Sequence, residues 1–272
     1  MPTLLTPTEI IPPGEGGGHP WWAQYGTMGQ DNVTSAYDED APALYYVALG
    51  GDDFVFGNGS DDTIYGGSGM DSLGGNDGDD LLYGQGDDDW ISGGAGRDNI
   101  FGGSGNDWIF GGEGADSING GSGNDTLFGD YIVGSTPEKG WVNYDDLIHG
   151  GAGNDQIMGA FGNDTLRGGT GEDVLFGGSG DDVLFGNDGS ADGDHDQFVF
   201  HMGDGTDTVM DYEVGVDTVL VGGGMTSRDI TGVSSGSFTV GGGRSESGLI
   251  VEFASGDVLQ FVGIYDIADI SF

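Results

Sequence analysis

A nine-residue repeat fills the middle of the chain and limits what the chain can fold into. The sequence reads GGSGMDSLG from Gly66, GGAGRDNIF from Gly93, GGSGNDWIF from Gly102 and GGSGNDTLF from Gly120. These units share the template G-G-x-G-x-D-x-U-x, in which U is a large aliphatic residue. A fixed period of this kind predicts a repeat architecture in which each unit packs mainly on its neighbours.

The aspartate at the sixth position recurs at nine-residue steps, and the residue two places after it is aliphatic in all fourteen units. An interruption over residues 129–145 inserts twelve residues beyond the nine-residue step, and the same phase resumes after it. The aspartates of this series are the candidate metal ligands: Asp53, Asp62, Asp71, Asp80, Asp89, Asp98, Asp107, Asp116, Asp125, Asp146, Asp155, Asp164, Asp173 and Asp182.

The two parts of the repeat predict a turn and a strand. Glycine enters conformations with positive φ without a steric penalty, so the first six residues of each unit are expected to form a turn that exposes carbonyl oxygens. The last three, x-U-x, are expected to form a short strand that directs U to one face. Two units make one turn of a flattened coil, so the fourteen units give about seven turns.

Successive aspartates would alternate between the two edges of this coil and stack about 4.8 Å apart, the spacing of neighbouring strands. Carboxylates at that separation repel each other unless a cation lies between them. Calcium suits this position, because the available ligands are carboxylate and carbonyl oxygens on a flexible frame. One ion between adjacent turns on each edge gives roughly a dozen calcium sites and makes calcium binding and folding a single event.

Composition excludes several other classes of protein. The chain has 47 acidic and 5 basic residues and a formal net charge of -42, so a compact state without counterions would repel itself. Such a composition alone favours an acidic disordered chain, but the order of the repeats argues against that interpretation. The few basic residues are too scattered to bind nucleic acid. The chain also lacks cysteine, a membrane-spanning apolar run and the pattern of a cleavable N-terminal signal peptide.

From Leu49 to about Tyr212, the chain resembles the RTX (repeats-in-toxin) family. This resemblance implies an all-β fold, a right-handed parallel β-roll (β-solenoid) with calcium in its turns. It also implies an extracellular or cell-surface protein that leaves the cell unfolded through the type I secretion machinery, guided by an uncleaved C-terminal signal. Asp196, Asp207 and Asp217 begin segments similar to the degenerate repeats that close the roll in secreted RTX proteases and lipases. We add Asp196 and Asp207 to the candidate calcium ligands.

Four regions are expected: a mobile segment over residues 1–20, an N-terminal cap over 21–48, the roll over 49–212 with the loop insertion at 129–145, and a C-terminal β cap with a secretion signal over 213–272. Caps rich in β structure are expected because an open end would expose the apolar interior of the coil. Within the last region, residues 249–253 and 258–261 predict a hairpin around Ser255, Gly256 and Asp257.

The sequence predicts no enzyme, because H-E-x-x-H is absent and no histidine follows Ser234 in the single G-x-S-x-G match. The leading hypothesis is a non-enzymatic surface, matrix or adhesion protein. The alternatives are a polysaccharide-binding module similar to the roll modules of alginate-modifying enzymes and a hydrolase with an unrecognised site. One predicted outer face is aromatic and would suit contact with a polysaccharide or a second copy; its residues are Phe54, Phe56, Trp90, Trp108, Phe110, Phe128 and Phe176.

Overall fold

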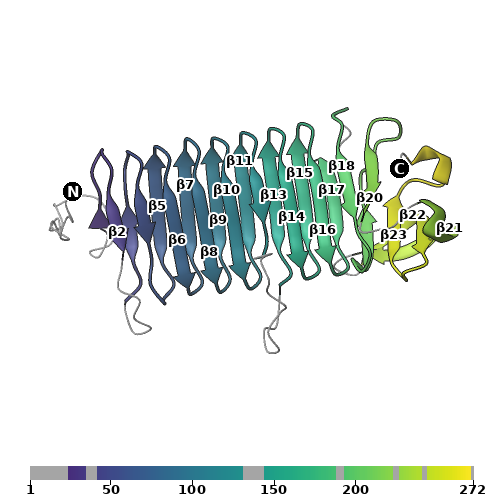
Figure 1. Cartoon of the computed structure of the whole chain (residues 1–272), viewed down its shortest axis with the longest axis horizontal. Helices are drawn as coiled ribbons and strands as arrows, with labels where there is room; N and C mark the ends of the chain where they lie inside the picture. Colours follow the sequence, from purple (N-terminus) through teal and green to yellow (C-terminus); the bar gives the residue numbers. More distant parts are fainter. Residues whose placement is uncertain are drawn as a thin grey trace.

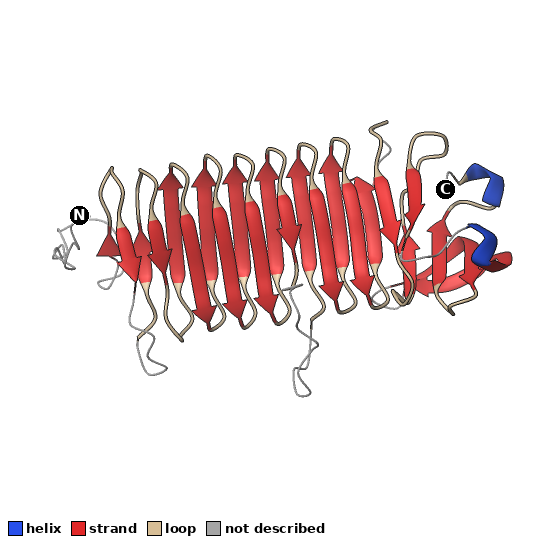
Figure 2. Ribbon diagram, in the orientation of Figure 1, coloured by secondary structure: helices blue, strands red, loops and turns tan. Residues whose placement is uncertain are grey.

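The computed structural model describes residues 24–34, 42–130, 144–187, 193–222, 227–240 and 244–270. The expected mobile segment over residues 1–20 lies outside the described residues, as does most of the loop insertion, residues 131–143. The described chain forms an elongated body in which strands and short turns follow one another from end to end (Figures 1 and 2). This all-β architecture, a parallel β-solenoid, confirms the predicted fold class.

Two sheets form the walls of the coil, and strands enter them alternately along the sequence. One sheet has thirteen strands in the order β1 (Gln24–Tyr25), β3 (Tyr45–Val47), β5 (Thr63–Ser68), β7 (Leu81–Gly86), β9 (Asn99–Ser104), β11 (Ser117–Ser122), β13 (Leu147–Ala152), β15 (Thr165–Thr170), β17 (Val183–Asn187), β19 (Thr206–Val209), β23 (Val258–Val262), β22 (Arg244–Phe253) and β21 (Ile230–Val240). The other has ten: β2 (Asn32–Thr34), β4 (Phe54–Phe56), β6 (Ser72–Asp77), β8 (Trp90–Ala95), β10 (Trp108–Glu113), β12 (Thr126–Phe128), β14 (Gln156–Phe161), β16 (Val174–Ser179), β18 (Gln197–Phe200) and β20 (Thr218–Val221).

Strand pairing confirms that two repeat units make one turn of the coil. Ile109 in β10 pairs in parallel with Ile91 in β8 and with Leu127 in β12, eighteen residues away on either side. The loop insertion does not disturb this register, because Ser117 in β11 pairs with Leu147 in β13. The later strands therefore keep the register of the earlier ones, as the phase of the repeat predicts.

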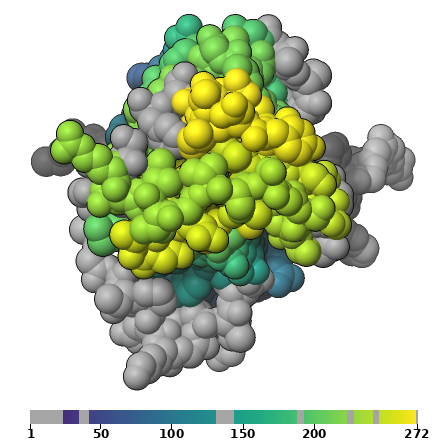
Figure 3. Space-filling model, turned by 90° about the vertical axis from the view of Figure 1, so that its right-hand side faces the viewer, coloured from purple at the N-terminus to yellow at the C-terminus, as the bar shows by residue number. Residues whose placement is uncertain are grey.

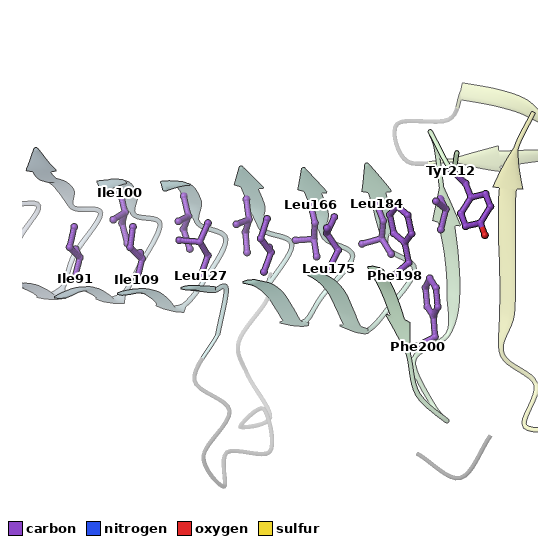
Figure 4. Close-up of a cluster of buried hydrophobic side chains, with 14 of the residues drawn as sticks. Ile91, Ile100, Ile109, Leu127, Leu166, Leu175, Leu184, Phe198, Phe200 and Tyr212 are labelled. Carbon is purple, nitrogen blue, oxygen red and sulfur yellow. The ribbon is translucent and has the colours of Figure 1, made fainter. Parts of the chain in front are cut away.

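The aliphatic residue of every unit points into the space between the two sheets. Figure 4 shows these side chains meeting in the interior of the roll, among them Ile91, Ile109 and Leu175. All fourteen expose 2% or less of their surface. Burial of one such side chain contributes about 1.5–3 kcal/mol, so this narrow column is the main apolar source of stability in the repeats.

The strands are longer than the repeat predicts. They continue through the first three positions of the next unit, so Gly112 pairs with Gly94 as well as Trp108 with Trp90. Parallel stacking keeps successive turns in register, and the backbone therefore continues its hydrogen bonds around the bend, as in the bond from Gly112 N to Gly129 O at 2.7 Å. Only the last three positions before each strand form the tight turn.

Stacking also extends further than the strict repeats indicate. The second sheet has ten parallel strands, compared with the seven turns that fourteen units make. The additional strands come from sequences that keep an aspartate and an apolar residue two places later but lose the glycines, such as Asp31-Asn-Val33 and Asp217-Thr-Val219. The degenerate repeats are therefore structurally part of the coil.

The C-terminal end of the roll is covered by an antiparallel unit. β21 pairs with β22, and β22 pairs with β23 from Gly248 opposite Val262 to Glu252 opposite Val258, which confirms the predicted hairpin. β23 joins the roll by parallel pairing with β19. Viewed from this end, the C-terminal residues, coloured light green to yellow, lie across the end of the roll (Figure 3). Two single-turn 3-10 helices, Ser227–Asp229 and Ile267–Asp269, accompany them, and no helix among the described residues is long and apolar enough to cross a membrane.

Candidate metal centre

Two columns of buried aspartates run along the two edges of the roll. Each lies immediately before the strand of its unit, as Asp107 lies before β10, so the backbone carries the carboxylate at the edge and Ile109 into the core. All sixteen aspartates selected from the sequence, Asp196 and Asp207 included, expose 3% or less of their surface. Carboxylates are seldom buried to this extent unless something compensates for their charge.

Hydrogen bonds connect the carboxylates within each column. The backbone N–H of Asp98 donates to Oδ1 of Asp116 at 2.8 Å, and across the insertion Asp125 N donates to Asp155 Oδ1 at 2.7 Å. One column runs through Asp53, Asp71, Asp89, Asp107, Asp125, Asp155, Asp173 and Asp196. The other runs through Asp62, Asp80, Asp98, Asp116, Asp146, Asp164, Asp182 and Asp207.

The second oxygen of most of these carboxylates is enclosed and accepts no hydrogen bond. This holds for Oδ2 of Asp53, Asp71, Asp80, Asp89, Asp98, Asp107, Asp116, Asp125, Asp146, Asp155, Asp164 and Asp182. A buried polar atom without a partner costs about 1–3 kcal/mol, and more when it is charged. Twelve such atoms at a regular interval indicate a ligand that the repeat is built to hold.

Glycine at the first position of each unit creates the space around this oxygen. A Cβ on Gly102 would lie 2.2 Å from Asp107 Oδ2 and 2.5 Å from the carbonyl oxygen of Gly120. A carboxylate oxygen and a carbonyl oxygen of the next turn therefore face the same small volume, which any side chain at position 102 would fill. The glycines at positions two and four, such as Gly103 and Gly105, have φ of 121° and 133° and close the turn.

The electrostatics of the columns favour a cation. Burial raises the pKa of Asp98 to about 8; the N–H donated by Asp80 opposes the shift, and the carboxylates of Asp116 and Asp80 add to it. Burial likewise raises the pKa of Asp146 to about 10, with neighbouring Asp164 and Asp116 contributing. At neutral pH these groups must either hold a proton or lie beside a positive charge.

The donor set fits calcium. It consists of carboxylate and backbone carbonyl oxygens, which are the ligands of hard cations. In the described ranges no three His, Cys, Asp or Glu side chains converge closely enough to hold an ion by themselves. Backbone carbonyls would therefore have to supply much of the coordination, and the glycine-rich turns expose them. Calcium bound there would supply positive charge between carboxylates of successive turns.

Sequence reasoning missed a second, exposed series of hydrogen bonds outside each column. The side chain one place before the column aspartate accepts from the backbone N–H of the equivalent residue one turn later. Asp88 accepts from Asn106 at 2.7 Å, Asn106 from Asn124 at 2.8 Å, and Asn124 from Asn154 at 2.8 Å. The signal was the frequent Asn or Asp at the fifth position, which the template treats as variable.

Two further column members lie outside the predicted set of ligands, although the segment from Asp217 is similar to the degenerate repeats. Asp31 N donates to Asp53 Oδ1 at 2.6 Å, and Asp196 N donates to Asp217 Oδ1 at 3.1 Å, so both Asp31 and Asp217 extend the first column. Each keeps the D-x-U core of the repeat without its glycines, which is the signal that could have found them. Ser234 of the G-x-S-x-G match is exposed and pairs with Ile250 in the middle of β21, so it does not lie at a strand-to-helix turn.

A parallel β-roll with oxygen-lined turns of this kind defines a class of metal-binding repeat proteins. A family model described as RTX calcium-binding nonapeptide repeat (4 copies) matches residues 46–73, 65–100, 74–109, 101–130, 143–166 and 158–190. The region from residue 46 to residue 190 therefore contains RTX calcium-binding repeats, as the resemblance predicted. Comparison with curated proteins gives no match.

Proposed function

We propose that this protein is a secreted RTX protein without enzymatic activity, which folds when it meets extracellular calcium and serves in a surface layer, a matrix or adhesion. The observation that carries the proposal is the set of twelve enclosed Oδ2 atoms without partners along the two columns. The sixteen aspartates of the columns are the proposed ligands, with roughly a dozen ions between successive turns. Asp31 and Asp217 extend the same series.

Calcium explains how such an acidic chain becomes compact. With a net charge of -42, roughly a dozen divalent ions would offset about half of the formal charge. Because the sites form only when successive turns stack, the free energy of binding is available to folding and not to the unfolded chain. The low calcium inside cells and the high calcium outside then decide where the roll forms.

The extracellular location and the type I route are part of this proposal and rest on the family. The division into four regions is also part of the proposal: an N-terminal segment 1–20, an N-terminal cap 21–48, the roll 49–212 and the C-terminal cap and signal 213–272. The antiparallel unit of β21, β22 and β23 supports a capping role, because it lies over the end of the apolar column and buries Phe253 and Phe261.

Calcium removal tests the proposal on the whole chain. Circular dichroism and small-angle scattering are recorded with calcium, after chelation, and after calcium is restored. We expect β structure and a compact elongated shape with calcium, an expanded disordered chain without it, and full recovery. Magnesium at the same concentration is the control, because its demand for octahedral geometry does not suit these turns. A chain that stays equally compact after chelation would exclude the proposal.

A specific observation favours a second candidate function, the binding of a neutral polysaccharide. On strands β4 to β16 of the ten-stranded sheet, both neighbours of the core residue point outward, and none of them is charged. They are Phe54, Phe56, Ser72, Gly74, Trp90, Ser92, Trp108, Phe110, Thr126, Phe128, Gln156, Met158, Val174 and Phe176. The seven predicted aromatic residues thus lie on one sheet, whereas the column aspartates lie at the edges of the roll.

The aromatic rings on this sheet form a partly exposed platform. Trp90 and Trp108 expose 41% and 49% of their surface, and the rings of Phe110 and Phe128 stack with centroids 4.8 Å apart. Aromatic faces suit the apolar faces of sugar rings, and hydroxyl and amide side chains beside them suit sugar hydroxyls. A second copy of the chain would bring another highly negative body to the same face, which opposes self-association.

Binding is tested with calcium-loaded protein by isothermal titration with a soluble neutral β-glucan, using alginate as an anionic polymer of similar length. The proposal predicts binding of the neutral polymer and at least a 10-fold loss of affinity in Trp108→Ala. The matched control is Tyr83→Ala, because Tyr83 belongs to an aromatic row on the other sheet that the sequence interpretation missed, stacked on Tyr65 at 4.6 Å and on Phe101 at 4.9 Å. Binding to neither polymer would exclude this second function.

A further inference from the structure

Asp130 occupies a position of the repeat where no other unit carries a charge. It follows Gly129 as the second residue of its unit, immediately before residues 131–143. The equivalent residue one turn earlier, Gly112, has a φ of 125°, whereas Asp130 does not adopt positive φ. The backbone at Asp130 therefore differs from that of the glycine at the equivalent position.

The side chain of Asp130 is buried and only half satisfied. It exposes 2% of its surface. Its Oδ2 accepts a hydrogen bond from the backbone N–H of Phe161, one turn later, at 3.0 Å. Its Oδ1 is fully enclosed and has no hydrogen-bond partner. The column aspartates have the same arrangement, because one oxygen accepts a hydrogen bond from the backbone and the other is enclosed without a partner.

Asp130 lies beside the second column. Asp116 N donates to Asp146 Oδ1 at 2.7 Å, and Asp146 N donates to Asp164 Oδ1 at 2.8 Å, so these three mark successive turns. The pKa of Asp130 is raised to about 8 by burial, and the charge of Asp116 adds to the shift. The charge of Asp130 in turn raises the pKa of Asp146 and of Asp164. The four carboxylates therefore share one electrostatic environment.

Oxygen atoms without partners surround the same turn. Oδ2 of Asp116 and Oδ2 of Asp146 accept no hydrogen bond. A Cβ on Gly129 would lie 2.0 Å from Asp146 Oδ2 and 2.5 Å from the carbonyl oxygen of Gly159. The residue before Asp130 thus forms the same oxygen-lined space that the regular units have, and Asp130 adds one more enclosed carboxylate oxygen to this part of the column.

Asn58 shows that a structural role does not require a charge at this position. It is also the second residue of its unit, exposes 2% of its surface, does not adopt positive φ, and has an Oδ1 without a hydrogen-bond partner. A neutral amide is therefore accommodated in the same place. Burying a carboxylate there is much more costly than burying an amide unless a cation compensates for its charge.

We propose that Asp130 is an additional calcium ligand outside the repeat pattern, acting with Asp116 or Asp146 and the exposed glycine carbonyls to make the site beside Asp130 the tightest calcium site of the roll. The affinity of calcium sites rises with the number of charged ligands, and this turn has one more than its neighbours. Since three side chains do not converge on one point among the described residues, the carbonyls complete the coordination. This inference rests on the proposed calcium-dependent folding.

The test compares Asp130→Asn with wild type and with Asp88→Asn, all as full-length protein. Asp130→Asn keeps an acceptor for Phe161 N and reproduces the residue found at position 58. Asp88→Asn removes the same charge from an exposed carboxylate, and Asn106 fills the equivalent position one turn later with an amide. Protein-bound calcium is counted by mass spectrometry at increasing concentrations of a competing chelator.

Wild type and Asp88→Asn should retain one ion after the others have been removed. Asp130→Asn should release that ion at an about 10-fold lower concentration of chelator. Equal retention in all three proteins would overturn the inference while leaving calcium-dependent folding intact. If wild type kept all of its structure after complete chelation, the proposed function would instead be refuted.

A crystal structure of calcium-loaded wild type decides the point without any variant. An ion coordinated by Asp130 Oδ1 supports the inference even if Asp130→Asn fails to fold. An Asp130 carboxyl with no ion in contact, in a roll whose other turns hold calcium, would overturn it.

Discussion

The backbone N–H of Asp107 donates a hydrogen bond to Oδ1 of Asp125, one turn further along the roll, at 2.9 Å. The other oxygen of Asp125 is enclosed and has no partner. Each column aspartate therefore has two separate duties, because one oxygen holds the preceding turn and the other faces the proposed ion. Substitutions can separate these duties, since an asparagine keeps the acceptor and loses the charge.

Two substitutions of Asp107 should separate the role of its charge from the role of its hydrogen-bond acceptor. Asp107→Asn keeps an acceptor for Asp89 N and lowers the charge at one site, so we expect the calcium midpoint of folding to rise by about 3- to 10-fold. Asp107→Ala also leaves a buried N–H unpaired, which adds about 1–3 kcal/mol. The midpoint is measured by circular dichroism during calcium titration. If the two variants behaved identically, or neither differed from Asp88→Asn, the assignment of the two oxygens would be wrong.

Adding one methyl group at Gly102 should damage a calcium site without straining the backbone, because Gly102 does not have positive φ. The new Cβ would collide with Asp107 Oδ2 and Gly120 O, at 2.2 and 2.5 Å. We expect Gly102→Ala to bind at least one ion fewer at saturation, measured by mass spectrometry. Gly86→Ala is the matched control, because its Cβ would meet nothing closer than 3.7 Å. Equal ion counts in the two variants would contradict the proposed cradle.

The coil could be predicted from the sequence because its two determinants recur in every unit. The aspartate and the aliphatic residue two places later fix which residue faces the edge and which faces the core, and their nine-residue period fixes the pairing of β10 with β8. The outer series of Asx side chains could not be predicted in the same way, because Met70, Arg97 and Ala115 interrupt it at the fifth position. Asp130 occurs once, so no period marks it.

The strict repeats account for only part of the roll for a related reason. Glycine marks the turns, but parallel stacking needs only a D-x-U segment in register, and Asp31 and Asp217 supply one at each end. The strands were also predicted too short, because the glycines read as turn residues still exchange backbone hydrogen bonds with the glycines of the next turn. The conformational preference of glycine predicts where the chain bends. The stacking of successive turns determines where the backbone pairing between strands ends.

Truncating a core side chain should destabilise the calcium-loaded roll by an amount that its burial predicts. Ile109 is fully buried between the two sheets, so Ile109→Ala should cost about 2–5 kcal/mol in the free energy of unfolding. Leu147 exposes 50% of its surface on the outer face of β13, so Leu147→Ala should cost about 0.5 kcal/mol or less. Denaturant unfolding at saturating calcium measures both. If the two variants lost similar amounts of unfolding free energy, Ile109 would not point into the core and Leu147 outward, as the strand pairing indicates.

Protons should substitute for calcium in the calcium-free chain. Burial raises the pKa of Asp98 to about 8 and that of Asp107 to about 7 in the folded roll. In the unfolded chain an aspartate has a pKa of about 3.9. A group whose pKa is raised by folding binds its proton more tightly in the folded state, so it stabilises the fold below the unfolded pKa and loses that contribution as pH rises through the folded pKa.

The calcium-free protein should therefore be most folded at about pH 4 and below, and it should lose its β structure as the pH rises to about 8. Calcium should remove this dependence at neutral pH, because the ion replaces the proton between the carboxylates, and acid should weaken the apparent affinity for calcium. Circular dichroism of dialysed, calcium-free protein across this range measures the first effect, and calcium titrations at two pH values measure the second. If the calcium-free chain were equally disordered at low and high pH, protonation of the buried carboxylates would not stabilise the roll, and this explanation of the aspartate columns would be wrong.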